Sequence, residues 1–127
     1  MQNKFIPYGR QEINNQDIES VLEVLKSDFI TQGTKVPLFE ELISKYCGAK
    51  FAYAVNSATS ALHLGCLSLG LKKGDIVWTS PISFVTSANC ALYCGASVDF
   101  VDIDPDTALI SVDLLEEKLK YAEKIGK

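Results

Sequence analysis

The segment at residues 56–60, Asn-Ser-Ala-Thr-Ser, has residue types suited to binding an anion. It follows a short apolar run and opens a helical pattern. At a helix start, the free N–H groups of Ala58 and Thr59 converge with the hydroxyls of Ser57, Thr59 and Ser60, where the helix dipole favours negative charge. A phosphate group would fit there. The alternative is that Asn56 or Ser57 only caps the helix. The glycine motifs of dinucleotide-binding and P-loop proteins, G-x-G-x-x-G and G-x-x-x-x-G-K-[ST], do not occur in the chain.

A second polar segment, residues 80–84, ends in Phe84, whose ring at a helix start can stack on a planar ligand. Taken alone, a phenylalanine at such a position belongs more often to a core. The acidic segment at residues 102–106 is typical of a solvated turn, with Pro105 fixing the backbone. His63 has no acidic side chain within helical reach, so we interpret it as a packed or half-exposed histidine.

The composition is that of an ordinary globular domain, with 127 residues, 47% apolar and 22% charged. A net charge of −4 does not favour binding to nucleic acid or to an anionic membrane surface. The N-terminus has no basic and then apolar leader, and no apolar stretch approaches the roughly 20 residues of a membrane span, so we expect a cytoplasmic protein. The four cysteines form no C-x-x-C pair and fall short of the ligand set of structural zinc, so we expect reduced thiols and no metal site.

Apolar spacing and turn residues predict five helices and three strands. The expected helices cover residues 14–25, 37–47, 57–69, 84–93 and 113–125, and the expected strands cover residues 51–55, 76–79 and 98–101. Strands separated by a helix need crossover connections, so the middle of the chain is expected to be β-α-β-α-β with a parallel sheet. In such an α/β sheet, ligands bind where the strands end and the chain leads into helices, which is where the three polar segments lie.

Individual elements carry their own end signals. Asn14 with Asp17 predicts a capped first helix, Gly48 predicts the end of the second, and Asp113 with Glu116 predicts a capping box for the last. The inward face of the helix at 84–93 is expected to hold small and apolar residues: Ala88, Ala91 and Leu92. A parallel sheet of three strands is small and leaves an edge unpaired, so we expect the chain to be part of something larger.

Four segments together resemble the DegT/DnrJ/EryC1/StrS family of sugar aminotransferases. They are Ile-Thr-Gln-Gly with Phe-Glu, at residues 30–33 and 39–40; Asn-Ser-Ala-Thr-Ser-Ala-Leu-His-Leu, at 56–64; Pro-Ile-Ser-Phe-Val-Thr-Ser-Ala-Asn, at 81–89; and the stretch from Gly-Ala to Val-Asp-Ile-Asp, at 95–104. The resemblance implies an α/β fold, part of the large domain of a pyridoxal 5'-phosphate (PLP) dependent transferase of the aspartate aminotransferase type. Within the family, the chain is most similar to members of pseudaminic acid biosynthesis, which move an amino group from L-glutamate to C4 of a UDP-linked 4-keto-6-deoxy sugar.

The resemblance also assigns residues. The cofactor phosphate would contact Ser57, Ala58 and Thr59, and Phe84 would stack on the pyridine ring. The residues that match the family's substrate contacts are Tyr8, Asp28, Phe29, Ile30 and Thr31. The family forms homodimers with shared active sites, and residues 31–33 would lie near that interface.

The resemblance divides the chain into an N-terminal helical arm and dimer-interface segment, residues 1–50, and a partial PLP-binding major domain, residues 51–127. In the family, the lysine that forms the Schiff base, the aspartate that pairs with the pyridinium nitrogen, and a small C-terminal domain lie beyond the position of Lys127. We therefore assign no catalytic residue and expect little bound cofactor and no turnover from this chain alone. A sugar dehydratase of the same family and a non-catalytic α/β module that binds a phosphate or nucleotide are the alternatives.

Overall fold

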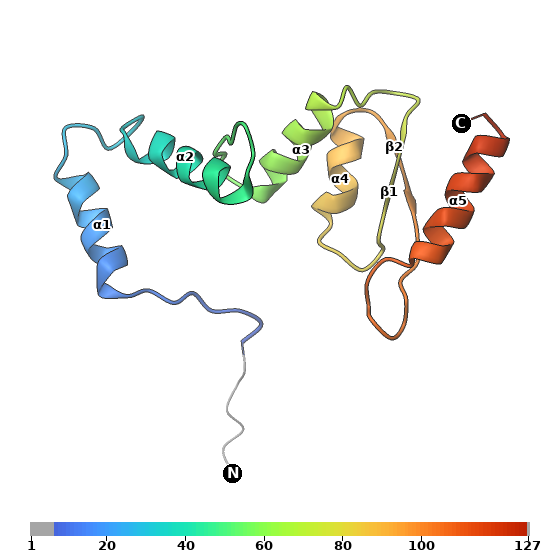
Figure 1. Cartoon of the computed structure of the whole chain (residues 1–127), viewed down its shortest axis with the longest axis horizontal. Helices are drawn as coiled ribbons and strands as arrows, with labels where there is room; N and C mark the ends of the chain where they lie inside the picture. The colour runs from blue at the N-terminus through green and yellow to red at the C-terminus, as the bar shows by residue number, and fades with distance from the viewer. Residues whose placement is uncertain (1–6, 127) are drawn as a thin grey trace, which may run out of the picture. The chain divides into compact units, whose positions relative to one another are not determined.

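The computed structural model describes residues 7–126, which contain five helices and one pair of strands (Figure 1). In chain order the elements are α1 (Asn15–Leu25), α2 (Lys35–Cys47), α3 (Ala58–Ser68), β1 (Ile76–Thr79), α4 (Thr86–Tyr93), β2 (Ser97–Phe100) and α5 (Val112–Lys124). The chain divides into two compact units between Ala54 and Val55. None of the helices within residues 7–126 is long and apolar enough to cross a membrane.

The first unit contains α1 and α2, and local signals set the ends of both helices. The side chain of Asn14 accepts hydrogen bonds from the backbone N–H groups of Gln16 and Asp17, and the carboxylate of Asp17 accepts from the N–H of Asn14. This reciprocal capping box confirms the predicted helix start. Helix α2 ends at Gly48, whose φ of +65° is the left-handed conformation that glycine adopts most readily.

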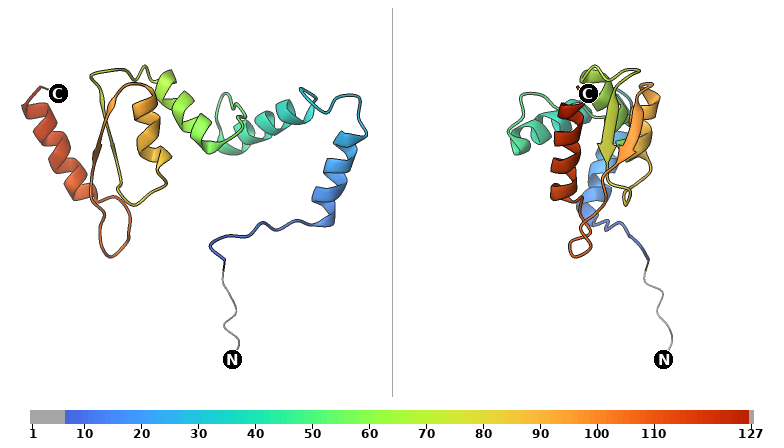
Figure 2. Two further views of the ribbon diagram at one scale, coloured as in Figure 1. Left: turned by 180° about the vertical axis from the view of Figure 1, so that it is seen from behind. Right: turned by 90° about the vertical axis from the view of Figure 1, so that its right-hand side faces the viewer.

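The second unit is built around the parallel pair β1 and β2, joined through α4. Ile76 lies opposite Ser97 and Thr79 lies opposite Phe100 along the pair. Helix α4 packs against both strands and against α3, and α5 lies on the other side of the strand pair (Figures 1 and 2). The buried apolar residues of the described chain all belong to this unit: Cys90, Ala91, Ala96 and Val101.

The α/β class of the fold is confirmed, but the first expected strand is wrong. Residues 51–55 form no strand, so the unit contains one β-α-β crossover instead of two. A strand is stabilised by the backbone hydrogen bonds of a neighbour. Here the N–H group of Ala54 donates to the carboxylate of Glu40, with N and Oε1 2.8 Å apart, so a side chain takes the place of a neighbouring strand.

Helix α5 begins at a different cap from the one predicted. Ser111 is the N-cap, and its Oγ accepts a hydrogen bond from the N–H of Leu114 at 3.3 Å. Asp113 lies inside the first turn, where its negative charge interacts favourably with the helix dipole. The helix therefore starts two residues before the capping box that the spacing of Asp113 and Glu116 predicted.

Helix α4 is also shorter than expected, because it begins at Thr86 and not at Phe84. Ala91 is buried as predicted, but Leu92 is 54% exposed and the buried thiol of Cys90 lies inward instead. The apolar face is therefore rotated toward Cys90 from the face that the sequence pattern indicated.

A single lysine connects α5 to the strand pair. The Nζ atom of Lys118 lies 2.6 Å from Oδ2 of Asp99, donates to the carbonyl oxygen of Phe100 at 2.7 Å, and lies 5.5 Å from the centre of the Trp78 ring. These three contacts reach both β1 and β2, so they hold α5 over the face of the strands that α4 leaves open.

Candidate functional site

The start of α3 is organised by a network of small polar side chains. Ser57 is the N-cap, and its Oγ accepts a hydrogen bond from the N–H of Ser60 at 3.2 Å. The hydroxyl of Ser60 in turn donates to Oδ1 of Asn56 at 2.7 Å. The capping role that the sequence left open between Asn56 and Ser57 therefore falls to Ser57.

This cap accepts a hydrogen bond from one backbone amide of the helix start and leaves other amides of the first turn free for a ligand. The first N–H groups of an α-helix have no acceptor within the helix, and the Ser57 side chain takes only the amide of Ser60. The amides of Ala58 and Thr59 belong to this first turn, and both Ser57 and Ala58 are exposed to solvent. Capping and anion binding are thus compatible at this helix start, and the residues present fit a phosphate group.

A hydrogen bond between two threonines brings the starts of α3 and α4 together. Oγ1 of Thr59 lies 3.2 Å from Oγ1 of Thr86, which is the first residue of α4 and only 3% exposed. Phe84 lies two residues before Thr86, in the connection that leaves β1, and its side chain is 73% exposed. The ring is therefore not part of a core in this structure. The predicted phosphate-binding turn and the predicted stacking ring belong to two adjoining helix starts.

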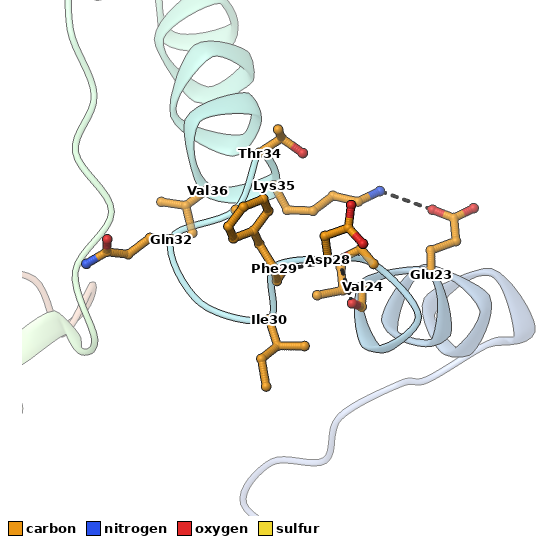
Figure 3. A pocket seen from close by; sticks show the side chains of 11 residues that line it. Glu23, Val24, Asp28, Phe29, Ile30, Gln32, Thr34, Lys35 and Val36 are labelled. Atoms are coloured by element: carbon orange, nitrogen blue, oxygen red, sulfur yellow. Dashed lines mark hydrogen bonds and ion pairs between the residues drawn. The ribbon is translucent and has the colours of Figure 1, made fainter.

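The first unit contains a separate hollow, of about 350 Å³, in the connection between α1 and α2 (Figure 3). Three of the predicted substrate contacts line it: Asp28, Phe29 and Ile30. Thr31 is not among its lining residues, and the fully exposed Tyr8 is not either. The structure thus gathers part of the predicted substrate set at one hollow.

A side-chain hydrogen bond and a close approach of the backbone hold the connection around this hollow in shape. The hydroxyl of Ser27 lies 2.7 Å from the carbonyl oxygen of Val24 and 3.1 Å from that of Phe29, so it ties the end of α1 to the connection. Gly33 approaches the same Phe29 carbonyl so closely that a Cβ atom at this position would lie 3.0 Å from the oxygen. A larger residue at position 33 would displace Phe29.

An ion pair that the sequence analysis missed borders the hollow. Nζ of Lys35, at the start of α2, lies 3.1 Å from Oε2 of Glu23 in the last turns of α1 (Figure 3). The two residues are twelve positions apart and belong to different helices, so no helical spacing rule relates them. Both side chains are more than half exposed, which limits the contribution of the pair to stability.

The remaining candidate residues have structural roles. The ring of His63 contacts that of Tyr93 edge to face, with centroids 5.3 Å apart, which confirms that it is a packed histidine. The acidic segment is confirmed as a turn, in which the amides of Thr107 and Asp106 donate to Asp104 and hold the pKa of that carboxyl below its usual value.

Three of the four thiols lie near one another on α3 and α4. Burial raises the pKa of the Cys66 thiol, and hydrogen bonding to the neighbouring thiols of Cys90 and Cys94 raises it further. A raised pKa keeps Cys66 in its weakly reactive thiol form at neutral pH. Within residues 7–126, no three His, Cys, Asp or Glu side chains are arranged as the ligands of a metal ion.

The model of one protein family matches residues 11–125, which is nearly the whole chain. The chain belongs to the DegT/DnrJ/EryC1/StrS aminotransferase family. A curated relative from Campylobacter jejuni, UDP-4-amino-4,6-dideoxy-N-acetyl-beta-L-altrosamine transaminase, is 42% identical to it over 121 residues. That alignment covers 95% of this chain and 32% of the relative, so the chain spans about one third of the length of the transaminase it matches.

Solved structures of sugar aminotransferases share the fold. PseC from Helicobacter pylori, an aminotransferase involved in the biosynthesis of pseudoaminic acid, superposes with a TM-score of 0.82 at 37% identity, over 90% of this chain and 31% of that one. A candidate sugar aminotransferase from Streptococcus pneumoniae, in its PLP form, gives a TM-score of 0.81 at 33% identity, over 88% of this chain and 29% of that one. The predicted α/β fold class and the aminotransferase family are therefore confirmed, and one of these solved relatives was determined with PLP.

Proposed function

We propose that this chain supplies the cofactor phosphate site and part of the substrate site of a PLP-dependent nucleotide-sugar aminotransferase. The complete reaction would move an amino group from L-glutamate to C4 of a UDP-linked 4-keto-6-deoxy sugar, as in pseudaminic acid biosynthesis. The observation that carries the proposal is the hydrogen bond of 3.2 Å between Thr59 and Thr86, which joins the helix start suited to a phosphate to the segment that bears Phe84.

The family resemblance gives the roles of individual residues, and the chemistry of the helix start supports them. The amides of Ala58 and Thr59 and the hydroxyls of Ser57 and Thr59 would bind the phosphate, and Phe84 would stack on the pyridine ring. When bound, PLP acts as an electron sink for the bond changes at the amino-bearing carbon. The side chains named here anchor and orient it.

The substrate contacts are proposed from the same family resemblance. Asp28, Phe29 and Ile30 line the hollow of the first unit, so they are available to a ligand. Tyr8 and Thr31 complete the proposed set. We further propose a homodimer with shared active sites, in which residues 1–50 form the arm and residues 51–127 part of the PLP-binding domain.

A sugar dehydratase of the same family is the second candidate. GDP-4-keto-6-deoxy-D-mannose-3-dehydratase from Escherichia coli, solved with bound hydrated PLP, matches this fold with a TM-score of 0.81 at 30% identity, over 87% of this chain and 30% of that one. The higher identity to the Campylobacter transaminase, 42%, favours the aminotransferase.

The test is a chimera in which this chain replaces the matching first third of the Campylobacter transaminase. With PLP, L-glutamate and the UDP-linked 4-keto sugar, we expect 2-oxoglutarate and the 4-amino sugar in equal amounts, measured by mass spectrometry. Thr59→Val in the chimera should weaken PLP binding, because one phosphate contact is lost. A matched control is Ser68→Ala, at the other end of α3.

Two outcomes would contradict the proposal. A chimera that binds no PLP would overturn the cofactor role of α3, and one that consumes the sugar without consuming glutamate would favour the dehydratase.

The chain by itself should bind PLP weakly. A phosphate contact of up to about 2 kcal/mol and a ring stack of about 1 kcal/mol together fall short of the roughly 4 kcal/mol of a millimolar complex.

A further inference from the structure

We propose that Thr86 is a positioning residue for the phosphate site, and that it acts by donating its hydroxyl proton to Oγ1 of Thr59. The inference rests on the proposed function, because it concerns the phosphate that α3 would bind. Thr86 touches neither cofactor nor substrate in this scheme. Its role is to set the direction in which the Thr59 hydroxyl donates.

Burial is the first observation that supports this role. Thr86 is 3% exposed, the one buried polar residue among those that the structure describes, and its hydroxyl pairs with Thr59 at 3.2 Å. A buried hydroxyl without a partner costs free energy, so this pair is favoured over separated side chains. Thr59 is half-buried: its hydroxyl contacts Thr86, and the preceding residue, Ala58, is exposed to solvent.

The direction of the hydrogen bond follows from the number of protons. Each hydroxyl has one proton to donate and can accept others. If Thr59 donates its proton to a phosphate oxygen, the contact between the two threonines must use the proton of Thr86. The order is then Thr86 to Thr59 to phosphate, and hydrogen bonds arranged in such a chain strengthen one another.

The second observation is that this contact joins two helices that pack together. Thr59 lies in the first turn of α3 and Thr86 is the first residue of α4, and α4 is packed on both strands of the unit. Thr86 therefore connects the phosphate-binding turn to the best buried part of the fold. Ser87, the next residue of α4, makes no such connection. It is partly exposed, and its hydroxyl lies 2.8 Å from that of Ser83.

The experiment measures ligand binding by isothermal titration calorimetry in the chimera of this chain with the rest of the Campylobacter transaminase, prepared without cofactor. The probes are pyridoxamine 5'-phosphate, inorganic phosphate, and pyridoxamine, which has no phosphate. The variants are Thr86→Val, Thr86→Ser, Thr59→Val and the double variant, with Ser87→Ala as the matched control on the same helix. Thr86→Cys, which keeps a small side chain but donates weakly, serves if Thr86→Val fails to fold.

We expect Thr86→Val to weaken binding of both phosphate-bearing probes by about 3- to 10-fold, the effect of one hydrogen bond. Thr86→Ser should stay within about twofold of the parent chimera, because it keeps the donor. In the Thr59→Val background, removing the Thr86 hydroxyl should cost nothing further, since the two act in series. Binding of pyridoxamine should be the same in all variants.

Several results would overturn the inference. Unchanged phosphate binding by Thr86→Val would overturn it while leaving the proposed function intact, as would an equal loss in the Thr59→Val background. A loss that is the same for pyridoxamine would show that Thr86 acts on packing alone. If the parent chimera binds pyridoxamine 5'-phosphate no better than pyridoxamine, the proposed phosphate site is itself wrong, and this inference is overturned with it.

Discussion

Ser57 shows how one residue can serve both the fold and the proposed site. Its side chain caps α3 through the amide of Ser60, while its own exposed position places the hydroxyl beside the free amides of the helix start. Capping needs an acceptor oxygen, and phosphate binding needs donors without added negative charge. The two roles can therefore be separated by the choice of substitution.

We predict that Ser57→Ala destabilises the chain by about 1 kcal/mol, because the Ser60 amide loses its acceptor. Ser57→Asp should keep the cap and the stability, but it should abolish phosphate binding, since a carboxylate repels the anion. Urea unfolding of the chain and a titration of the chimera with pyridoxamine 5'-phosphate measure the two effects. Phosphate binding by the Ser57→Asp chimera equal to that of the parent chimera would contradict the proposed site.

At the scale of elements, α5 depends on Lys118 for its place beside the strands. The Lys118 side chain contacts Asp99, the carbonyl of Phe100 and the ring of Trp78, and no other described ion pair joins this helix to the strand pair. The pair between Lys120 and Glu116 lies within α5 and is exposed. These two lysines differ in contacts but lie two residues apart on one helix.

We predict that Lys118→Met raises the rate of amide hydrogen exchange in α5 several-fold, since α5 then loses its hydrogen bonds to Asp99 and to the carbonyl oxygen of Phe100. Lys120→Met is the matched control and should change exchange little, because exposed pairs within a helix contribute weakly. Equal exchange rates in the two variants would show that Lys118 does not hold α5.

The same contact predicts a response to acid. The hydrogen bond from Lys118, followed by that from the N–H of Phe100, lowers the pKa of Asp99. A carboxyl whose pKa is lower in the folded state stabilises the fold above its unfolded pKa, about 3.9, and loses that contribution as the pH falls through its folded pKa. The protection of the α5 amides, taken relative to the intrinsic exchange rate at each pH, should therefore decrease below about pH 4. In Asp99→Asn the protection should already be lowered at pH 7 and respond less to acid.

At the scale of the whole molecule, the apolar side chains are mostly uncovered. The buried apolar residues among those described are small or medium in size, and α1 and α2 of the first unit contain no buried residue. Exposed side chains on these two helices include Val21, Leu25, Phe39 and Leu42. Apolar surface of this extent is typical of a protein–protein or interdomain interface.

We predict that the 127-residue chain binds the dye ANS, because its apolar side chains are exposed. We also predict that its urea m-value is below about 1 kcal/mol/M, the lower limit for small proteins, because unfolding exposes little additional surface. The chimera with the rest of the Campylobacter transaminase should bind far less dye. If the chain alone binds no dye and unfolds sharply, its apolar faces are covered in solution by another copy, which sedimentation would detect.

Local chemistry in the sequence was enough to predict much of this protein. The capping box at Asn14, the stop at Gly48 and the helix start at Ser57 depend on atoms within four residues of one another, and the structure confirms all three. The α/β class and the family also follow from short segments in order along the chain. The binding roles of Ser57, Thr59 and Phe84 stay predictions.

Only the tertiary structure decided the contacts between distant residues. The expected strand at 51–55 fails because a strand needs a neighbour, and the Ala54 amide finds the Glu40 carboxylate instead. Thr86 could not be identified as the partner of Thr59, because 27 residues separate them and either hydroxyl could have faced solvent. Such pairs are selected by which helices pack together, and helix packing depends on burial over the whole unit.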